Sequence, residues 1–278
     1  YWLVHIDQEN LRVAEVGEYR VQQRFIACVL YYATNGEEWT GASNYLDGSL
    51  HECDWDGVTC NANDIALIDL STKNLSGSIP AELKSLTSLE AMKLVANSIG
   101  GTIPDGFFDS LNQLAWFDLS QNLIEGTIPD LKESTTPALE TVFLRNNRFV
   151  GTVPYFPNVQ NIHVEENSFT AIDSRYATSS EFLTEFVGYD NGFSGPLPNV
   201  WNAPKLELLD FGLNRWTGPI PQSLWDLPSL RSLIIDFCDL SGTLPSSTGG
   251  TTFQHVWLQS NRLGGSIPST FGTMWPEL

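Results

Sequence analysis

The sequence predicts an α/β solenoid, in which short strand-containing units stack behind a helical N-terminal segment. Three observations support this prediction. One pattern recurs every 20 to 25 residues along most of the 278-residue chain, and the first 64 residues lack it but have helical periodicity. In addition, 42% of the residues are hydrophobic, which is enough for a continuous core. Because one unit cannot bury its apolar side alone, the units must stack to form that core.

The repeat is clearest at residues 114–129, which read LAWFDLSQNLIEGTIP. We index each copy by the position of Asn122, called the slot. The residue two positions after the slot is apolar in all nine copies, the residue four after is glycine in eight, and the residue seven after is proline in eight. The copy at Asn167 has neither and follows the previous slot by only 20 residues. The nine slots are held by Lys73, Asn97, Asn122, Asn147, Asn167, Asn191, Asn214, Cys238 and Asn261.

Each copy combines a short strand with a turn. Apolar residues alternate before the slot, as at Phe117 and Leu119, which indicates a strand with one side facing the core. The slot asparagine follows the strand, where its amide can hydrogen-bond backbone groups of the neighbouring turn. Stacked asparagines would then satisfy polar atoms that are otherwise buried without partners. The glycine permits a tight backbone there, and the proline ends the segment.

The N-terminal segment has a different pattern. Residues 15–33 have helical spacing, and Gly36 follows the expected end of the helix. Trp39, Trp55 and the string CDWDGVTC at residues 53–60 come next. An open solenoid end would expose core side chains and an unpaired strand edge, so a cap is required there. The expected apolar side chains of the helix are Val16, Tyr19, Phe25, Ile26, Val29 and Leu30.

The string LxxLxLxxNxLxGxIP resembles the plant-type leucine-rich repeat, which occurs in receptor ectodomains and inhibitor proteins of plants, with similar proteins in algae. The resemblance covers residues 65–278, with nine copies behind a capping domain at residues 1–64. It implies a curved solenoid with a parallel β-sheet on the concave face. It also implies a second sheet of short strands around GxIP, and helical or 3₁₀ turns on the convex face.

The resemblance further implies a disulfide bond between Cys53 and Cys60, because the cap of this family contains a helix, a Trp-rich turn and a disulfide. The alternative is half of a zinc site, but no second Cys/His pair follows at ligand spacing, so we expect no metal. Cys28 and Cys238 are expected to be buried free thiols. The disulfide and the sequon that begins at Asn74, a candidate for glycosylation, favour an extracellular or cell-surface location.

Composition and motifs exclude several functions. The chain has 33 Asp and Glu residues against 14 Lys and Arg residues, and its net charge of −19 repels nucleic acids and anionic membranes. The longest apolar run, residues 25–32, is far shorter than the about 20 residues of a membrane helix. Motifs of serine hydrolases, zinc proteases and nucleotide-binding enzymes are missing in the context that each requires. We therefore expect a protein that is not an enzyme, with no catalytic residues and no cofactor.

Binding remains, and the repeat register indicates where. Residues one, two, four and six positions before the slot project from the predicted concave strands or their edge. They are small or polar in the first copies, as at Ser71 and Ala96, but aromatic or charged from the third copy onwards. Large aromatics with arginine are typical of interface hot spots, although some rings could instead pack sideways on neighbouring strands. The candidate ligand-binding residues are Trp116, Phe143, Arg145, His163, Glu165, Tyr189, Asp210, Asp236, Phe237 and Trp257.

These features predict a protein or peptide ligand, and the surrounding acidic residues favour a basic one. Two classes of function remain open. The first is the ligand-recognition ectodomain of a receptor-like or adhesion protein, and the second is a secreted binder without signalling, such as an inhibitor of a cell-wall-degrading enzyme. Ice binding is a minor option, because the row four positions before the slot is not a regular array. No cap pattern follows Pro268, so we expect the natural chain to continue beyond Leu278.

Overall fold

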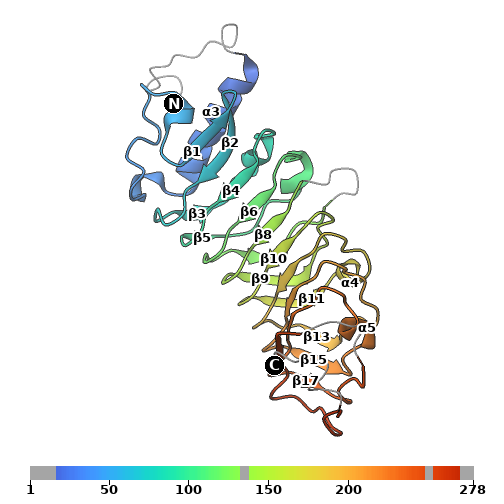
Figure 1. Ribbon diagram of the computed structural model, residues 1–278. Coiled ribbons are helices and arrows are strands. Elements are labelled where there is room, and N and C mark those ends of the chain that lie inside the picture. Colours follow the sequence, from blue (N-terminus) through green and yellow to red (C-terminus); the bar gives the residue numbers. More distant parts are fainter. Residues whose placement is uncertain (1–16, 132–137, 248–252, 270–278) are drawn as a thin grey trace. The chain divides into compact units, whose positions relative to one another are not determined.

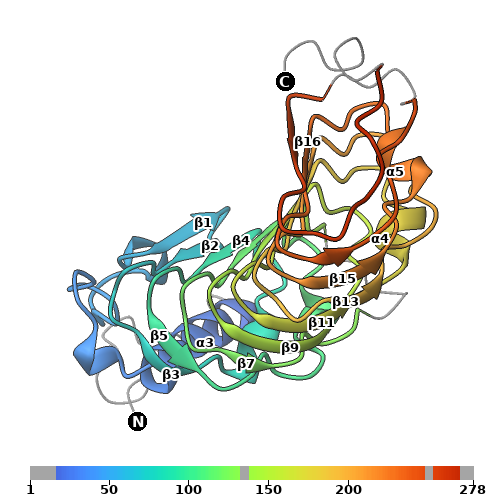
Figure 2. The ribbon, with the colours of Figure 1, turned by 90° about the horizontal axis from the view of Figure 1, so that it is seen from below.

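The computed structural model describes residues 17–131, 138–247 and 253–269. In these ranges short strands follow one another coil by coil, with helical turns on the opposite side of the coils (Figure 1; Figure 2). The chain divides into two compact units, residues 1–139 and 140–278. The expected C-terminal features beyond residue 269, and Val16 of the expected helix, lie outside the described residues.

The first unit begins with the predicted helix. Helix α3 (Glu18–Ala33) is followed by the 3₁₀ turns η1 (Gly36–Glu38) and η2 (Glu52–Asp54). Strand β1 (Val58–Asn61) pairs antiparallel with β2 (Asp64–Asp69) and so covers its open edge. The rings of Tyr45 and Trp55 are buried 5.3 Å apart, and the Tyr45 hydroxyl donates a hydrogen bond to the carbonyl of Ala27 in α3. Backbone pairing and an aromatic core therefore close this end of the solenoid.

A buried ion cluster, which the sequence did not predict, joins α3 to η2. The fully buried Glu52 accepts a hydrogen bond from the equally buried Arg24 at 3.0 Å. It also accepts from Gln23 at 2.9 Å and from Arg20 at 3.2 Å. Burial alone would raise the pKa of Glu52, but the hydrogen bonds from Arg20 and Gln23 outweigh it, and the pKa lies below its usual range. The expected apolar face is therefore partly wrong, because Phe25 is 47% exposed.

The coils of the first unit follow the repeat. Strands β2, β4 (Ala91–Lys93) and β6 (Trp116–Asp118) pair in parallel. Ile68, Met92 and Phe117 are in register and fully buried, as the alternation predicts. Lateral strands β3 (Ser76–Ser78), β5 (Ser98–Gly100) and β7 (Glu125–Gly126) lie at the start of the GxIP segments or directly before them, and β3 and β5 pair in parallel. The turns opposite the main sheet are η3 (Ala81–Ser85) and η4 (Phe107–Ser110).

The second unit continues the pattern. Its main sheet is parallel and contains, in spatial order, β8 (Thr141–Phe143), β10 (Asn161–His163), β12 (Glu185–Val187), β14 (Leu208–Asp210), β16 (Ser232–Ile234) and β18 (His255–Trp257). Its lateral strands are β9 (Arg148–Val153), β11 (Ser168–Ile172), β13 (Ser194–Pro196), β15 (Arg215–Gly218) and β17 (Asp239–Leu240). Its helical turns are α4 (Arg175–Thr178) and α5 (Gln222–Trp225). The parallel sheets and helical turns are those that the resemblance implies.

The short copy at Asn167 is accommodated by an aromatic side chain. Strand β11 loses regular register with β9 after Phe169, where the usual glycine is absent. Helix α4 then places Tyr176 in the core with no exposed surface. The Tyr176 hydroxyl donates to the carbonyl of Pro154 at 2.8 Å, so its polar atom is satisfied. The ring of Tyr176, from the following coil, thus packs beside the short segment that contains Pro154 and Phe156.

The slot asparagines form the predicted ladder. The amide nitrogen of Asn214 donates to the carbonyls of Phe211 and Gly212 in its own coil and of Gly188 in the coil before, at 2.9 to 3.1 Å. Its side-chain oxygen accepts the N–H group of Phe193 at 3.1 Å. At the eighth slot, the thiol of Cys238 lies 3.6 Å from the carbonyl oxygen of Phe211 and is buried.

A backbone feature of the coils was not predicted. The residue immediately before the slot has a positive φ in all nine copies, from 48° at Phe237 to 58° at Thr72. This is the left-handed region, which side chains other than glycine, asparagine and aspartate enter at a cost. The strand exit is therefore a fixed turn whose geometry does not depend on the residue type.

The cysteines behave as predicted. Cys53 and Cys60 are joined by a disulfide, and Cys28 and Cys238 are buried free thiols. Asn74 is exposed, and its side chain donates to the carbonyl of Glu38 at 2.9 Å; its glycosylation stays a prediction. Among the residues described, no helix has both the length and the apolar character to cross a bilayer.

Candidate ligand-binding face

The main sheet of the second unit aligns most candidate residues in two rows. Nine of the ten lie in this unit, and Trp116 lies on β6 in the first. Strand pairing places the first row at the strand ends, where it contains Phe143, His163, Val187, Asp210, Ile234 and Trp257. The second row, two positions further along, contains Arg145, Glu165, Tyr189, Gly212, Asp236 and Gln259. We call these two rows, with the residue before each slot, the strand-exit face.

Some of the predicted rings pack sideways. The rings of Phe143 and His163 lie 4.5 Å apart, and His163 Nε2 lies 3.3 Å from a carboxylate oxygen of Glu185. In the first unit, the Lys93 ammonium lies 4.7 Å from the centre of the Trp116 ring, which is 37% exposed. Contacts with side chains of neighbouring strands are therefore one reason for the presence of these rings on the sheet.

Two carboxylates converge where the second row has a glycine. The Asp210 carboxylate accepts the N–H group of Gly212 at 3.1 Å, and the Asp236 carboxylate accepts a hydrogen bond from the Gln259 amide. A Cβ atom on Gly212 would lie 2.3 Å from Asp236 Oδ1 and 3.5 Å from Asp210 Oδ1. The Asp236 carboxylate thus lies over Gly212, with Asp210 close by. Burial raises the pKa of Asp210 to about 6, and the charge of Asp236 adds to the effect.

Glu165 is buried although it was predicted to face outward. Its exposure is 4%, and its Oε2 has no hydrogen-bond partner among the described residues. Burial raises the pKa of Glu165 to about 7. Two smaller charge effects act in opposite directions, because Arg145 lowers this pKa and Asp210 raises it. The half-buried Tyr189 donates to a carboxylate oxygen of Glu166 at 2.9 Å, and burial with this hydrogen bond raises the Tyr189 pKa to about 12.

Exposed apolar side chains lie beside the acids. Phe237 is 53% exposed, Trp257 51% and Leu213 48%. The sequence predicted Phe237 and Trp257 on this face but missed Leu213 and Gly212. The signal was available, because Leu213 occupies the same position before the slot as Phe237, one coil earlier.

The face combines negative charge with exposed apolar surface. Such a combination can bind a cationic group and an apolar group together. Among the described residues, no group of three or more His, Cys, Asp or Glu side chains has an arrangement suited to a metal ion. Negative charge and exposed apolar surface are the interactions that the face offers to a ligand.

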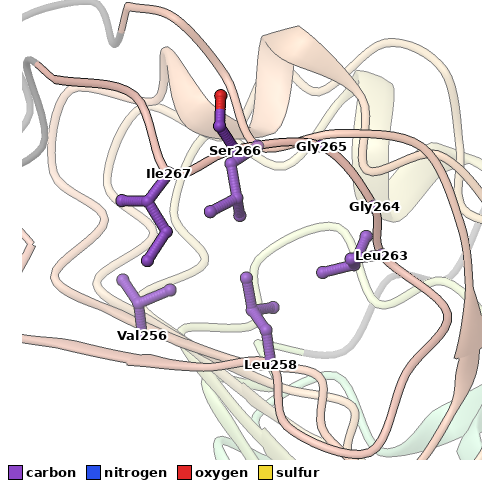
Figure 3. A pocket seen from close by; sticks show the side chains of 8 residues that line it. Val256, Leu258, Leu263, Gly264, Gly265, Ser266 and Ile267 are labelled. Carbon is purple, nitrogen blue, oxygen red and sulfur yellow. The ribbon is translucent and has the colours of Figure 1, made fainter.

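A separate cavity of about 490 Å³ lies at the last described coil. Figure 3 shows the side chains of Val256, Leu258, Leu263 and Ile267 around it. Val256 is the inward residue between the outward His255 and Trp257, so the cavity continues the solenoid core. It is not part of the strand-exit face.

The parallel main sheet, the lateral strands, the asparagine ladder and the disulfide-bonded N-terminal cap define a leucine-rich repeat solenoid of the plant type. Residues 252–274 match the family described as Leucine Rich Repeat. Receptor-like protein 36 of Arabidopsis thaliana is 34% identical over 200 residues, which cover 70% of this chain and 27% of that protein. The chain is thus similar to plant receptor-like proteins, and it spans about a quarter of the length of this relative.

Solved structures show the same likeness. The ectodomain of the Arabidopsis receptor kinase HAESA, in complex with an N-terminally extended IDA peptide hormone, matches with a TM-score of 0.77 and 27% identity, over 92% of this chain and 44% of that chain. A plant ice-binding protein matches with a TM-score of 0.71 and 23% identity, over 90% of this chain and 89% of that chain. The second likeness is one of fold alone.

Proposed function

We propose that this chain is an extracellular or cell-surface ligand-recognition domain of a receptor-like or adhesion protein. It binds a protein or peptide, and it acts by binding rather than by catalysis. The ligand lies along the strand-exit face of the second unit, which corresponds to the predicted concave face.

The likeness to plant receptor ectodomains supports the class of function. HAESA was solved with a peptide hormone, and this chain matches that ectodomain over 92% of its own length. A solenoid presents its main sheet as one continuous surface, which suits an extended peptide.

The observation that carries the proposal is the exposure of Phe237 and Trp257 beside the acids Asp210 and Asp236. Large exposed rings reduce solubility and do nothing for the core, so their grouping on one face indicates an interface. The neighbouring carboxylates favour a ligand with basic groups.

A secreted binder without signalling, such as an inhibitor of a cell-wall-degrading enzyme, is the alternative. It would use the same face. The gene sequence downstream of Leu278 distinguishes the two, because a signalling receptor requires a membrane anchor. Ice binding is disfavoured because the first row mixes Phe, His, Val, Asp, Ile and Trp, whereas an ice-binding face is flat and repetitive.

The test is a selection of random linear peptides displayed on phage against the immobilised purified chain. Synthetic copies of the enriched peptides are then titrated into the wild type and into Tyr189→Ala, Trp257→Ala and the control Ser71→Ala. We expect each aromatic replacement to weaken binding by about 2 kcal/mol or more, with no effect of the control. We also expect binding to weaken as salt concentration rises.

Enriched peptides that bind both aromatic variants as strongly as the wild type would show that the strand-exit face is the wrong surface. Circular dichroism of each variant confirms that the fold is kept.

A further inference from the structure

The strand-exit face contains a glycine that the backbone conformation does not require. Gly212 has a backbone conformation open to any L residue, so glycine is not needed for the turn. A side chain at residue 212 would instead displace the Asp236 carboxylate, because its Cβ atom would lie 2.3 Å from Asp236 Oδ1. The coils before place Glu165 and Tyr189 at the equivalent position. The glycine therefore lets the Asp236 carboxylate lie against the backbone close to Asp210, and two like charges so placed attract a cation.

A second, independent observation is the state of Glu165. Its side chain is 96% buried, and Oε2 has no hydrogen-bond partner among the described residues. Its charge interacts with that of Asp210. A buried carboxylate without a donor is costly, and a cationic group bound beside Asp210 would lower that cost through its charge.

The third observation concerns Leu213 and Phe237, which directly follow Gly212 and Asp236. Both have a positive φ, of 52° and 48°, and both are about half exposed. The other coils of the second unit have polar residues at this position, namely Asn146, Glu166, Asp190 and Ser260. Bulky apolar residues suit neither the left-handed conformation nor exposure to water, so the core and the turn do not explain them.

We propose that this part of the face is an arginine subsite: Asp210 and Asp236 receive the guanidinium group of a peptide partner, and Leu213 and Phe237 cover an adjoining apolar residue of that partner. The inference rests on the proposed function. A guanidinium group suits the place better than an ammonium group, because its planar fork of donors can bridge two carboxylates.

The test uses a defined probe, the dipeptide Ac-Arg-Leu-NH₂, titrated into the purified chain by saturation-transfer NMR. Its uncharged isostere Ac-citrulline-Leu-NH₂ is the matched control ligand. We expect the arginine probe to bind with a Kd on the order of 1–10 mM, and the citrulline probe at least tenfold more weakly. Failure of the arginine probe to bind at 20 mM, or equal binding of the two probes, overturns the proposal.

Binding of the arginine probe to variants of the chain tests which residues form the subsite. Asp210→Asn and Asp236→Asn keep a side-chain oxygen for the hydrogen bonds from Gly212 and Gln259, so the fold is maintained and only charge is lost. The double variant should bind the arginine probe at least tenfold more weakly. Leu213→Asn with Phe237→Asn should weaken it severalfold, since asparagine tolerates the left-handed turn. The control is Asp173→Asn, which removes an acid paired with Arg175 outside this face.

The peptides selected for the proposed function separate the two ideas. If they bind the Asp210→Asn/Asp236→Asn variant as strongly as the wild type but are lost on Trp257→Ala, the arginine subsite is wrong and the proposed function stands. If they also bind Trp257→Ala and Tyr189→Ala unchanged, the proposed function itself is wrong.

Discussion

The side-chain oxygen of Asn97 accepts the backbone N–H group of Lys73 at 3.1 Å, so the asparagine of one coil satisfies the turn of the coil before it. The same oxygen accepts the N–H group of Leu75 at 2.9 Å, and the amide nitrogen donates to carbonyls of both coils. Each slot side chain therefore supports the preceding turn as well as its own. Where the slot residue is not asparagine, as at Lys73, these side-chain hydrogen bonds to the turn are missing.

The ladder predicts unequal effects of alanine at two slots. Asn122 is 5% exposed, accepts the N–H group of Ile99 and donates to the carbonyl of Leu94. Asn122→Ala leaves these groups unsatisfied and should lower the free energy of unfolding by roughly 1–3 kcal/mol. Lys73→Ala removes only an exposed hydrogen bond to Gly41 and should cost much less. Denaturant unfolding measures both, and equal losses would contradict the ladder.

The fold was predictable because the same local sequence pattern occurs nine times. Alternating apolar residues such as Phe117 and Leu119 fix the inward side of each strand, and both are buried. The structure of the cap was harder to predict, because its sequence pattern occurs only once and cannot be compared with other copies. There, helical spacing alone assigned Phe25 to the core, whereas the buried partners of Glu52 are Gln23 and Arg24. Charge pairing across distant segments overrode the apolar pattern.

The cap disulfide predicts a thiol count. In the denatured protein without reductant, intact mass after alkylation should show two modified thiols, those of Cys28 and Cys238, and four after reduction. Four modified thiols without reductant would remove the disulfide. Cys53→Ala should destabilise the cap by about 2–3 kcal/mol, since the bond closes a short loop.

The buried ion cluster predicts a large effect in the cap. Glu52→Gln removes the buried negative charge that pairs with the fully buried guanidinium group of Arg24, which should cost about 3–5 kcal/mol of stability. The control is Glu82→Gln, on an exposed position of η3, which should change stability by less than about 0.5 kcal/mol. Thermal unfolding monitored by circular dichroism compares them. A loss at Glu52 as small as that of the control would mean that the cluster contributes little.

The candidate face was only partly predictable. The repeat register correctly identified Phe237 and Trp257 as outward-facing, because a period-2 strand fixes which side each residue faces. It did not predict the burial of Glu165, which depends on the neighbouring coils on both sides. Gly212 was missed for a related reason. A glycine contributes no side chain to a list of candidates, and its importance appears only when the positions of Asp210 and Asp236 are known.

The last prediction follows from the buried acid Glu165. Its pKa is about 7 in the folded chain, against an ordinary value of 4.5 that we take for the unfolded chain. Between these pH values the folded protein retains a proton that the unfolded chain has released. Stability from this group is therefore fully present below pH 4.5 and is lost as pH rises through 7, with a difference of roughly 3 kcal/mol. Asp210 contributes in the same direction between its ordinary 3.8 and about 6.

Glu165→Gln isolates this contribution, because glutamine has a similar shape and does not titrate. The variant should gain stability relative to the wild type as pH rises from 5 to 8, and the gain should level off above pH 7 to 8. Exposed Glu207, which directly precedes β14, provides the matched control, Glu207→Gln, whose curve should run parallel to that of the wild type. Urea unfolding at each pH gives the three curves. A Glu165→Gln curve parallel to the wild type would mean that Glu165 is ionised in the folded protein across this range, with its buried oxygen paired to a donor.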